Sequence, residues 1–240
     1  MKANTTMTTA ATPRILACDI FGTVVDWHTS IANEVEALRP GVDGSAFALA
    51  WRAGYAPAMQ RVMRGELGWM LVDDLHRMIL DSILPVFDLQ DMAEEERRHL
   101  NAAWHRLDAW PDAAAGLTRL KMRYTLCTLS NGNLSLLTNM AKRAGLPWDC
   151  ILSAEVFRAY KPDPATYLGV AKVFGVVPEQ VMMVATHQSD LAAARNCGLQ
   201  TAYIERPFEY GPGQAKDSSP NPANTVHATD LLQLADQLGC

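Results

Sequence analysis

The chain has 240 residues, of which 49% are hydrophobic and 20% are charged. This usage is ordinary for a folded protein and excludes disordered, collagen-like and fibrous classes. The 21 basic and 26 acidic side chains give a net charge of −5 without any basic run, so nucleic acid is not an expected partner. Five cysteines without a paired spacing predict reduced thiols and a cytoplasmic location: Cys18, Cys127, Cys150, Cys197 and Cys240.

Two stretches lack the pattern that a targeting or membrane segment requires. Residues 1–13 are rich in threonine and alanine and lack an apolar run of signal-peptide length, so we interpret them as a flexible leader. Residues 124–141 carry no charge, but serine, asparagine and glycine interrupt them repeatedly. The sequence therefore predicts no membrane partner.

The first half of the chain is predicted to hold one strand followed by helices. Residues 15–20 (ILACDI) are apolar and β-leaning, and they end at a turn formed by Phe21 and Gly22. In the segment 28–110, apolar residues recur at helical spacing in four stretches with proline or glycine between them. These four predicted helices cover residues 30–39, 47–63, 68–84 and 94–107.

From Pro111 onward, predicted helices and strands alternate regularly. The strands are 124–129, 150–153, 181–185 and 201–204, and the helices are 112–123, 134–146, 164–175 and 189–198. Residues 211–225, rich in proline, glycine and serine, predict a surface loop before a last helix at 230–238. Such alternation is typical of βαβ units around a parallel sheet. We therefore predict an α/β fold with a Rossmann-like, doubly wound core (14–27 plus 111–240) and an inserted helical cap domain (28–110).

Polar residues follow four of the predicted strands. Because the carboxyl ends of parallel strands meet at one edge of the sheet, these residues are expected to converge there into a ligand site. They are Asp19 and Thr23, then Ser130 and Asn131, then Lys161, and finally Thr186, His187 and Asp190.

Four motifs, CDIFGTVVDW, TLSNGN, AYKPDPATY and VATHQSDLAAA, occur in the order that is found in the haloacid dehalogenase superfamily. The resemblance covers nearly the whole chain, including the cap. Within this superfamily the chain resembles the L-2-haloacid dehalogenase branch through DIFGT, SNGN, YKPDP and, in the cap, WRAGY. The resemblance implies hydrolysis of short 2-haloalkanoic acids to 2-hydroxy acids, with (S)-substrate preference, inversion at C2, and no metal or other cofactor.

The resemblance also implies how the first bond is broken. The Asp19 carboxylate attacks C2 of the substrate, which gives an aspartyl ester and free halide. Thr23 orients this carboxylate, and Lys161 offsets the repulsion between it and the anionic substrate. Arg52, in WRAGY, stands where the branch has a cap arginine that reaches the substrate and the leaving halide.

Other residues are expected to bind the substrate. Ser130 and Asn131, with backbone N–H groups at the following helix start, can bind its carboxylate. Phe21 and Trp69 are expected to exclude water that competes for the halide. Tyr167, six residues after Lys161, is expected to support that lysine.

Hydrolysis of the ester requires a base for the attacking water, and the sequence leaves this role open. Asp190 with Lys161 is the candidate pair. The branch commonly has Ser-Ser-Asn before the last aspartate, whereas this chain has Ala185, Thr186 and His187. His187 could act as the base or a halide donor, or it could only position other groups.

Two other readings of the sequence remain open. A Mg²⁺-dependent phosphatase of the same superfamily needs a second aspartate where this chain has Phe21, and its fourth motif commonly carries paired acids, whereas only Asp190 is present. A non-enzymatic binding module is compatible with Ala185, but Asp19 and the other motif residues argue against it. A homodimer is compatible with exposed aromatic residues of the cap.

Overall fold

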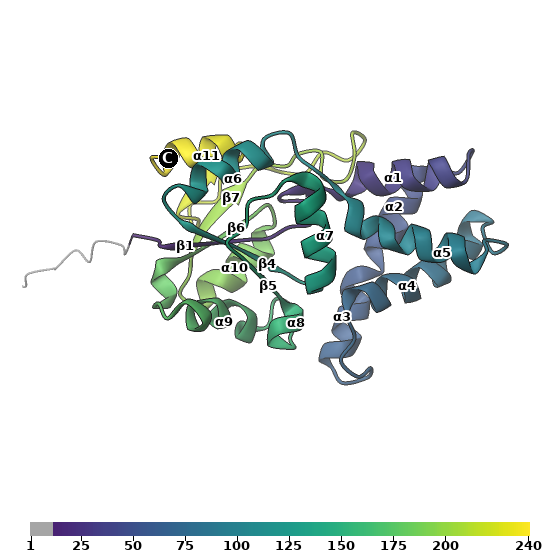
Figure 1. Cartoon of the computed structure of the whole chain (residues 1–240), viewed down its shortest axis with the longest axis horizontal. Coiled ribbons are helices and arrows are strands. Elements are labelled where there is room, and N and C mark those ends of the chain that lie inside the picture. Colours follow the sequence, from purple (N-terminus) through teal and green to yellow (C-terminus); the bar gives the residue numbers. More distant parts are fainter. Residues whose placement is uncertain (1–11) are drawn as a thin grey trace, which may run out of the picture.

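The computed structural model describes residues 12–240, so residues 1–11 of the predicted leader lie outside the described residues. A six-stranded sheet runs through the middle of the core, with the strand order β5-β4-β1-β6-β7-β8 (Figure 1). All neighbouring strands in this sheet are parallel. Its strands are β1 (Ile15–Cys18), β4 (Thr125–Ser130), β5 (Cys150–Ser153), β6 (Val181–Ala185), β7 (Gln200–Ile204) and β8 (Val226–Ala228).

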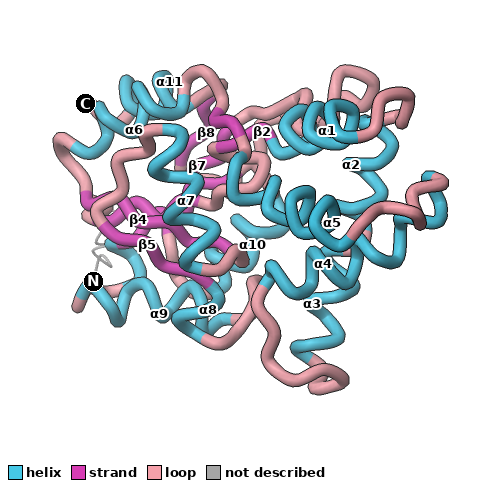
Figure 2. The backbone as a smooth tube through the Cα atoms, turned by 45° about the vertical axis from the view of Figure 1, so that its right-hand side comes forward, coloured by secondary structure: helices cyan, strands magenta, loops and turns pink. Residues whose placement is uncertain are grey.

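Helices cover both faces of this sheet because its strands are apolar on both faces. In β1, Leu16 and Cys18 belong to one buried cluster, and Ile15 and Ala17 belong to the other. One face is covered by α6 (Ala113–Lys121), α7 (Leu134–Ala144) and α11 (Leu231–Gln237), and the other by α9 (Pro164–Phe174) and α10 (Gln188–Asn196) (Figures 1 and 2). The prediction of a doubly wound α/β core is confirmed.

The helical segment lies beside the sheet, on the right in Figure 1. It leaves and re-enters the core through two short antiparallel strands, in which Val25 pairs with Ala109 and Asp26 with Asp108. Its elements are β2 (Val25–Asp26), α1 (Trp27–Leu38), α2 (Gly44–Ala53), α3 (Tyr55–Met63), α4 (Val72–Ile83), η1 (Leu84–Phe87), α5 (Glu94–Asn101), η2 (Ala102–Arg106) and β3 (Asp108–Ala109). The division into a core and a cap domain remains our proposal.

The predicted helices of this segment differ from the observed ones at their ends. The stretch 47–63 forms two helices, which meet at Gly54, where a side chain would collide with Ile79 of α4. The stretch 68–84 becomes helical only at residue 72, just before Asp73 and Asp74, whose charges favour a helix start. The stretch 94–107 continues beyond Asn101 as a 3-10 helix.

Several short elements were absent from the prediction. They are β2, β3, β8, α8 (Ala154–Phe157) and η3 (Pro178–Gln180). Each has two to four residues, which is too few for a hydrophobic period to be recognised. Within residues 12–240, no helix combines the length and the apolar character that crossing a bilayer requires.

The contact between α6 and α11 depends on Gly116. A Cβ atom there would lie 2.7 Å from backbone and side-chain atoms of Leu231. We expect Gly116→Ala to lower the free energy of unfolding by about 1–2 kcal/mol, because overpacking outweighs the gain in helix propensity. Urea denaturation measures this change. Gly68→Ala is the control, because its added methyl group would meet no atom within 4 Å; equal stability of the two variants would contradict the prediction.

Candidate active site

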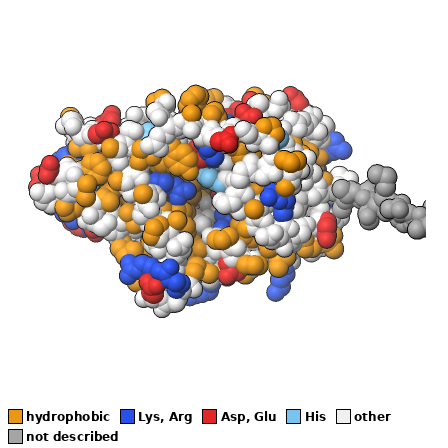
Figure 3. Space-filling model, turned by 180° about the vertical axis from the view of Figure 1, so that it is seen from behind, with side chains coloured by type: hydrophobic (Ala, Val, Ile, Leu, Met, Phe, Trp, Pro, Cys, Tyr) orange, Lys and Arg blue, Asp and Glu red, His pale blue; other side chains and the backbone are white. Residues whose placement is uncertain are grey.

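A cavity of about 260 Å³ lies between the carboxyl end of the sheet and helices α2 and α3. Figure 3 shows the surface hollowed near the middle of one face, with basic side chains and a histidine around the hollow. The strand order places β1 at the centre, and the chain proceeds to β4 and β5 on one side and to β6, β7 and β8 on the other. The cavity therefore lies at the topological switch point, where open parallel sheets bind ligands.

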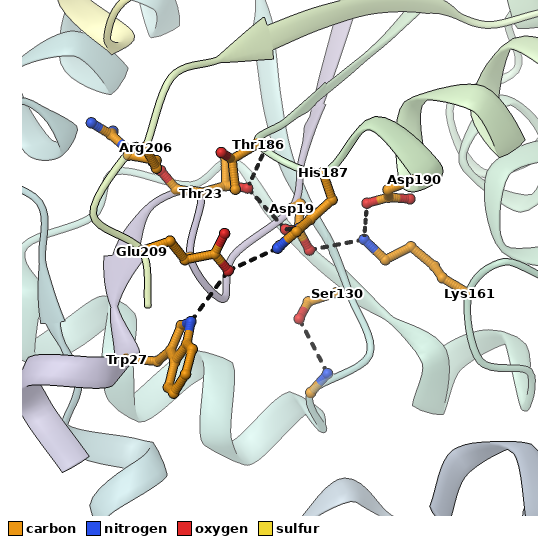
Figure 4. Close-up of polar contacts among 12 residues, drawn as sticks. Asp19, Thr23, Trp27, Ser130, Lys161, Thr186, His187, Asp190, Arg206 and Glu209 are labelled. Atoms are coloured by element: carbon orange, nitrogen blue, oxygen red, sulfur yellow. Dashed lines mark hydrogen bonds and ion pairs between the residues drawn. The ribbon is translucent and has the colours of Figure 1, made fainter. Parts of the chain in front are cut away.

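Asp19 lies at the centre of the site and directly follows β1. Its backbone N–H donates to Val184 O of the neighbouring β6, and the residue is only 6% exposed. The Thr23 hydroxyl donates to Asp19 Oδ2 at 2.9 Å and accepts from Thr186 N at 3.0 Å. Lys161 Nζ donates to Asp19 Oδ1 at 2.9 Å (Figure 4). Both carboxylate oxygens therefore have a donor that fixes their orientation.

Lys161 links two carboxylates at the wall of the cavity. Its Nζ also donates to Asp190 Oδ2 at 2.6 Å, and Tyr167 donates its hydroxyl proton to Asp190 Oδ1 at 2.6 Å. Tyr167 therefore contacts Asp190 rather than the lysine that we expected it to support. The backbone N–H of Lys161 donates to Asn131 Oδ1 at 2.8 Å, which joins the loops that follow β4 and β5.

His187 lies between two carboxylates. Its Nδ1 is 3.3 Å from Asp19 Oδ2, and its Nε2 is 2.8 Å from Glu209 Oε1. Glu209 comes from the loop between β7 and β8, and its other oxygen, Oε2, accepts from Lys216 Nζ at 2.7 Å. The charged side chains of the site thus form a row in which the sign alternates. In order they are Asp190, Lys161, Asp19, His187, Glu209 and Lys216.

Burial and neighbouring charges shift the pKa values of this row in opposite directions. Burial raises the pKa of Asp19, but Lys161 and His187 outweigh it and hold this pKa well below its usual value. Burial lowers the pKa of Lys161, but Asp19 and Asp190 outweigh it and raise this pKa. For His187, hydrogen bonds to Asp19 and Glu209 outweigh burial and raise the pKa to about 9. At neutral pH Asp19 is ionised, and Lys161 and His187 are protonated.

The aromatic and cationic wall of the cavity comes from the helical segment. Arg52 lies with its guanidinium over the ring of Tyr55, 4.3 Å from the centroid, and its Nε has no hydrogen-bond partner among residues 12–240. Phe21 contacts Tyr55 edge to face at a centroid distance of 6.2 Å. Asn131, Phe21 and Arg52 all line the cavity, as do Met59 and Tyr55.

Besides Thr23, which is fully buried and bonds to Asp19, two predicted site residues do not line the cavity. Ser130 is fully buried at the end of β4, and its Oγ accepts from Gly132 N at 3.1 Å. Trp69 does not line the cavity but stacks on Tyr160 at a centroid distance of 5.0 Å. Tyr160 directly precedes Lys161 in the chain. Both residues therefore contact the segments that carry site residues rather than the cavity itself.

Four residues of the site were not among those predicted from the sequence: Glu209, Lys216, Tyr55 and Tyr210. The rule that polar residues follow the strands could have found Glu209, because the strand 201–204 is followed by Glu205 to Glu209 in the same way. Tyr55 lies in WRAGY beside Arg52, and Tyr210 directly follows Glu209. Nothing in the local pattern distinguished Lys216 from other lysines of a surface loop.

The arrangement of the carboxylates does not fit a metal ion. Within the described part of the chain, no three His, Cys, Asp or Glu side chains are grouped as ligands. The ammonium group of Lys161 lies between Asp19 and Asp190, where a cation shared by these two residues would be bound. The residues therefore match a site in which lysine supplies the positive charge.

His187 makes the stability of the fold depend on pH. Because its pKa is raised from 6.5 to about 9, the ion pairs with Asp19 and Glu209 stabilise the folded state fully below pH 6.5. This stabilisation is lost as the pH rises through 9, and it amounts to about 3 kcal/mol. We expect the difference in unfolding free energy between the wild type and His187→Asn to shrink by that amount between pH 6.5 and 9.

Urea denaturation at both pH values provides the measurement. His99→Asn is the matched control, because the side chain of His99 is more than half exposed. The wild type and the control should lose the same stability over this interval. A parallel pH dependence of the wild type and His187→Asn would contradict the prediction.

Comparisons with known proteins agree with this geometry. The model of the haloacid dehalogenase-like hydrolase family matches residues 13–198. The (S)-2-haloacid dehalogenase 4A of Burkholderia cepacia is 31% identical over 82% of this chain and 86% of that protein. The crystal structure of a defluorinating L-2-haloacid dehalogenase is 45% identical, with a TM-score of 0.90 over 95% of this chain and 96% of that one.

The crystal structure of another L-2-haloacid dehalogenase is 43% identical, with a TM-score of 0.90 over 95% of this chain and 100% of that one. The family match spans most of the chain and includes the motifs that carry Asp19, Asn131, Lys161 and Asp190. The sequence-based prediction of the superfamily is therefore confirmed, and the protein belongs to the haloacid dehalogenase-like hydrolases.

Proposed function

We propose that this protein is an (S)-2-haloacid dehalogenase that converts short 2-haloalkanoic acids to 2-hydroxy acids through an ester on Asp19. The observation that carries the proposal is the Asp19 carboxylate, which is 6% exposed, ionised, and held by Thr23 and Lys161 at the edge of a small cavity. The names of the similar proteins, which are (S)-2- and L-2-haloacid dehalogenases, support the same substrate class.

The first half-reaction is a displacement at carbon. One Asp19 oxygen forms a bond to C2 while the carbon–halogen bond breaks and the halide leaves with the electron pair. Attack from the side opposite the halide inverts C2. Two anions about 4 Å apart repel by about 4 kcal/mol at the surface of a protein. The Lys161 ammonium, 2.9 Å from Asp19, and the Arg52 guanidinium at the cavity wall offset this repulsion.

The remaining site residues bind the substrate and keep water out. Asn131 and the backbone N–H groups that follow it bind the substrate carboxylate. Phe21 and Tyr55 form an apolar wall that limits hydration of the nucleophile and of the halide. Ser130 holds the turn that carries Asn131, and Trp69 packs on Tyr160 next to Lys161.

The phosphatase alternative lacks a proton donor. Phe21 occupies the position at which a second aspartate would protonate the leaving alcohol, and the phenyl ring contacts Tyr55 and Trp104 instead. Our expectations of a cytoplasmic location and of a homodimer remain predictions from the sequence.

One assay distinguishes the candidate functions. We expect the protein to release chloride from (S)-2-chloropropionate at a rate that EDTA does not change, and to leave p-nitrophenyl phosphate with Mg²⁺ intact. Ion chromatography and phenolate absorbance measure the two products. Phosphate-ester cleavage without chloride release would favour the phosphatase, and the absence of both activities would favour a binding module.

Replacing the nucleophile should abolish the reaction. We expect Asp19→Asn to lower the rate of chloride release by at least ~10³-fold, because an amide cannot form the ester. Asp91→Asn, which makes the same change at an exposed site, should retain the wild-type rate. Chloride release by Asp19→Asn at an undiminished rate would exclude Asp19 as the nucleophile.

The source of the product oxygen provides a separate prediction. In ¹⁸O-labelled water with enzyme in excess, the hydroxyl group of the first product should contain ordinary oxygen, because it comes from the Asp19 carboxylate. Mass spectrometry of the product and of the Asp19 peptide should find the label in the protein. Label in the first product would indicate direct attack by water.

A further inference from the structure

The loop between β7 and β8 is built onto the turn that follows the nucleophile. Arg206 of this loop donates from Nε to Thr23 O at 2.9 Å, and its two terminal nitrogens bind both oxygens of Asp112. The Glu209 backbone N–H donates to Arg206 O at 3.1 Å. These bonds fix the backbone of the loop at Arg206 and at Glu209, three residues later.

The Glu209 side chain is fully buried and has a partner at each oxygen. Oε1 is 2.8 Å from His187 Nε2 and 3.3 Å from Trp27 Nε1. Oε2 accepts from Lys216 Nζ at 2.7 Å, and the same Nζ donates to Thr186 Oγ1 at 2.9 Å. Glu209 therefore makes contacts on three sides, and one of them is the imidazole that faces Asp19 (Figure 4).

Gly22 provides the space for this carboxylate. Its φ is +82°, a conformation that favours glycine, and a Cβ atom there would overlap with Oε1 of Glu209. The turn between Asp19 and Thr23 is thus shaped to receive Glu209. A charge this deeply buried is costly unless it is paired, and its pairs are His187 and Lys216.

The contact with Glu209 determines which nitrogen of His187 is free. When the imidazole is neutral, Glu209 accepts the proton of Nε2, so the lone pair is on Nδ1. Nδ1 is the nitrogen 3.3 Å from Asp19 Oδ2, and the carboxyl carbon of Asp19 is the atom that water must attack in the ester. The lone pair therefore lies next to the carboxyl group that becomes the ester.

The other candidate base is engaged elsewhere. Asp190 accepts from Lys161 at Oδ2 and from Tyr167 at Oδ1, both at 2.6 Å. Lys161 keeps its proton, because Asp19 and Asp190 outweigh burial and raise its pKa. Both oxygens of Asp190 are therefore already hydrogen-bonded and protonated Lys161 has no lone pair, whereas Nδ1 of His187 lies next to Asp19.

We propose that His187 is the base that deprotonates the hydrolytic water and that Glu209, fixed by Lys216 and Trp27, is the residue that positions His187 for this step. The inference rests on the proposed function, since it concerns the second half of the same reaction. Nothing in the four motifs points to Glu209, which lies outside all of them.

The step balances as follows. His187 Nδ1 takes one proton of the water, and the oxygen forms a bond to the carboxyl carbon of Asp19. The bond from that carbon to the ester oxygen, which is the former Asp19 oxygen now bonded to C2, then breaks, and the 2-hydroxy acid leaves with the second proton of the water. Asp19 returns as a carboxylate and His187 as an imidazolium. Before this step the His187 imidazolium loses one proton to solvent and becomes neutral, so each turnover releases one halide and one proton.

The charges around His187 change in the direction that this step requires. The charged groups that face it are Asp19 and Glu209, with Lys161 and Lys216 behind them. In the free enzyme both carboxylates favour the imidazolium, whose positive charge attracts an anionic substrate. Formation of the ester removes the charge of Asp19, so His187 loses one of its two carboxylate partners and its pKa falls.

Rapid-quench kinetics with (S)-2-chloropropionate and two variants, His187→Asn and Glu209→Gln, test the proposal. We expect each variant to release one chloride per chain in a burst and then to turn over about 10²-fold more slowly than the wild type. The ester should accumulate on the Asp19 peptide, which mass spectrometry detects. A change in packing alone would not slow the second half-reaction selectively.

Glu205→Gln is the matched control, because Glu205 forms a similar pair with His227 at 2.6 Å on the neighbouring strand. It should react like the wild type. Fast steady-state turnover of His187→Asn would overturn the role of His187, and fast turnover of Glu209→Gln would overturn that of Glu209. Loss of the chloride burst in either variant would also overturn the proposal, because the residue would then serve the first step. A wild type that releases no chloride would instead refute the proposed function.

Discussion

The Asp19 carboxylate is 6% exposed and has therefore lost most of its hydration. The fold has to replace the lost water with other hydrogen-bond donors and positive charges. The groups that do so for Asp19 come from different parts of the chain. Thr23 follows in the same turn, Lys161 comes from the loop before α9, and His187 comes from the loop after β6. They can meet only because parallel strands end at one edge, with β1 between β4 and β6. The sheet topology is therefore what allows the ionised nucleophile to exist at a largely buried position.

A second buried carboxylate, Glu209, extends this requirement beyond the motifs. Two negative side chains flank His187, and Lys161 and Lys216 lie at the outer ends of the row. Charge is thus balanced along the row rather than within separate pairs. Removing charge from Asp19, as ester formation does, leaves His187 with one carboxylate partner instead of two. The chemistry of the first half-reaction and the protonation of His187 are coupled for that reason.

The sequence predicted the parts of the site that follow strong patterns. Asp19 and Lys161 were found because they lie at strand ends within recognisable motifs, and long apolar periods predicted the alternating core. Glu209 was missed although it follows the strand 201–204, and Lys216 was missed because it lies in a stretch rich in proline and glycine, where no period exists. Their positions depend on tertiary contacts, such as that of Arg206 with Asp112. The collision that a side chain at Gly54 would make with Ile79 is likewise a tertiary contact, which hydrophobic periodicity does not report.

The loop after β4 also connects the two halves of the cavity. Asn131 lines the cavity, and two residues later Asn133 donates to Asp73 Oδ2 of α4 at 2.9 Å and accepts from Asp73 N. Asp73 in turn is 3.0 Å from His105 Nε2. The helical segment that carries Arg52 is therefore anchored to the same loop that carries Asn131. Any movement of this segment that carries Arg52 away from Asp19 has to strain or break the contact with Asn133. The positions of the proposed anion-binding groups are thus coupled to each other through the backbone of one short turn.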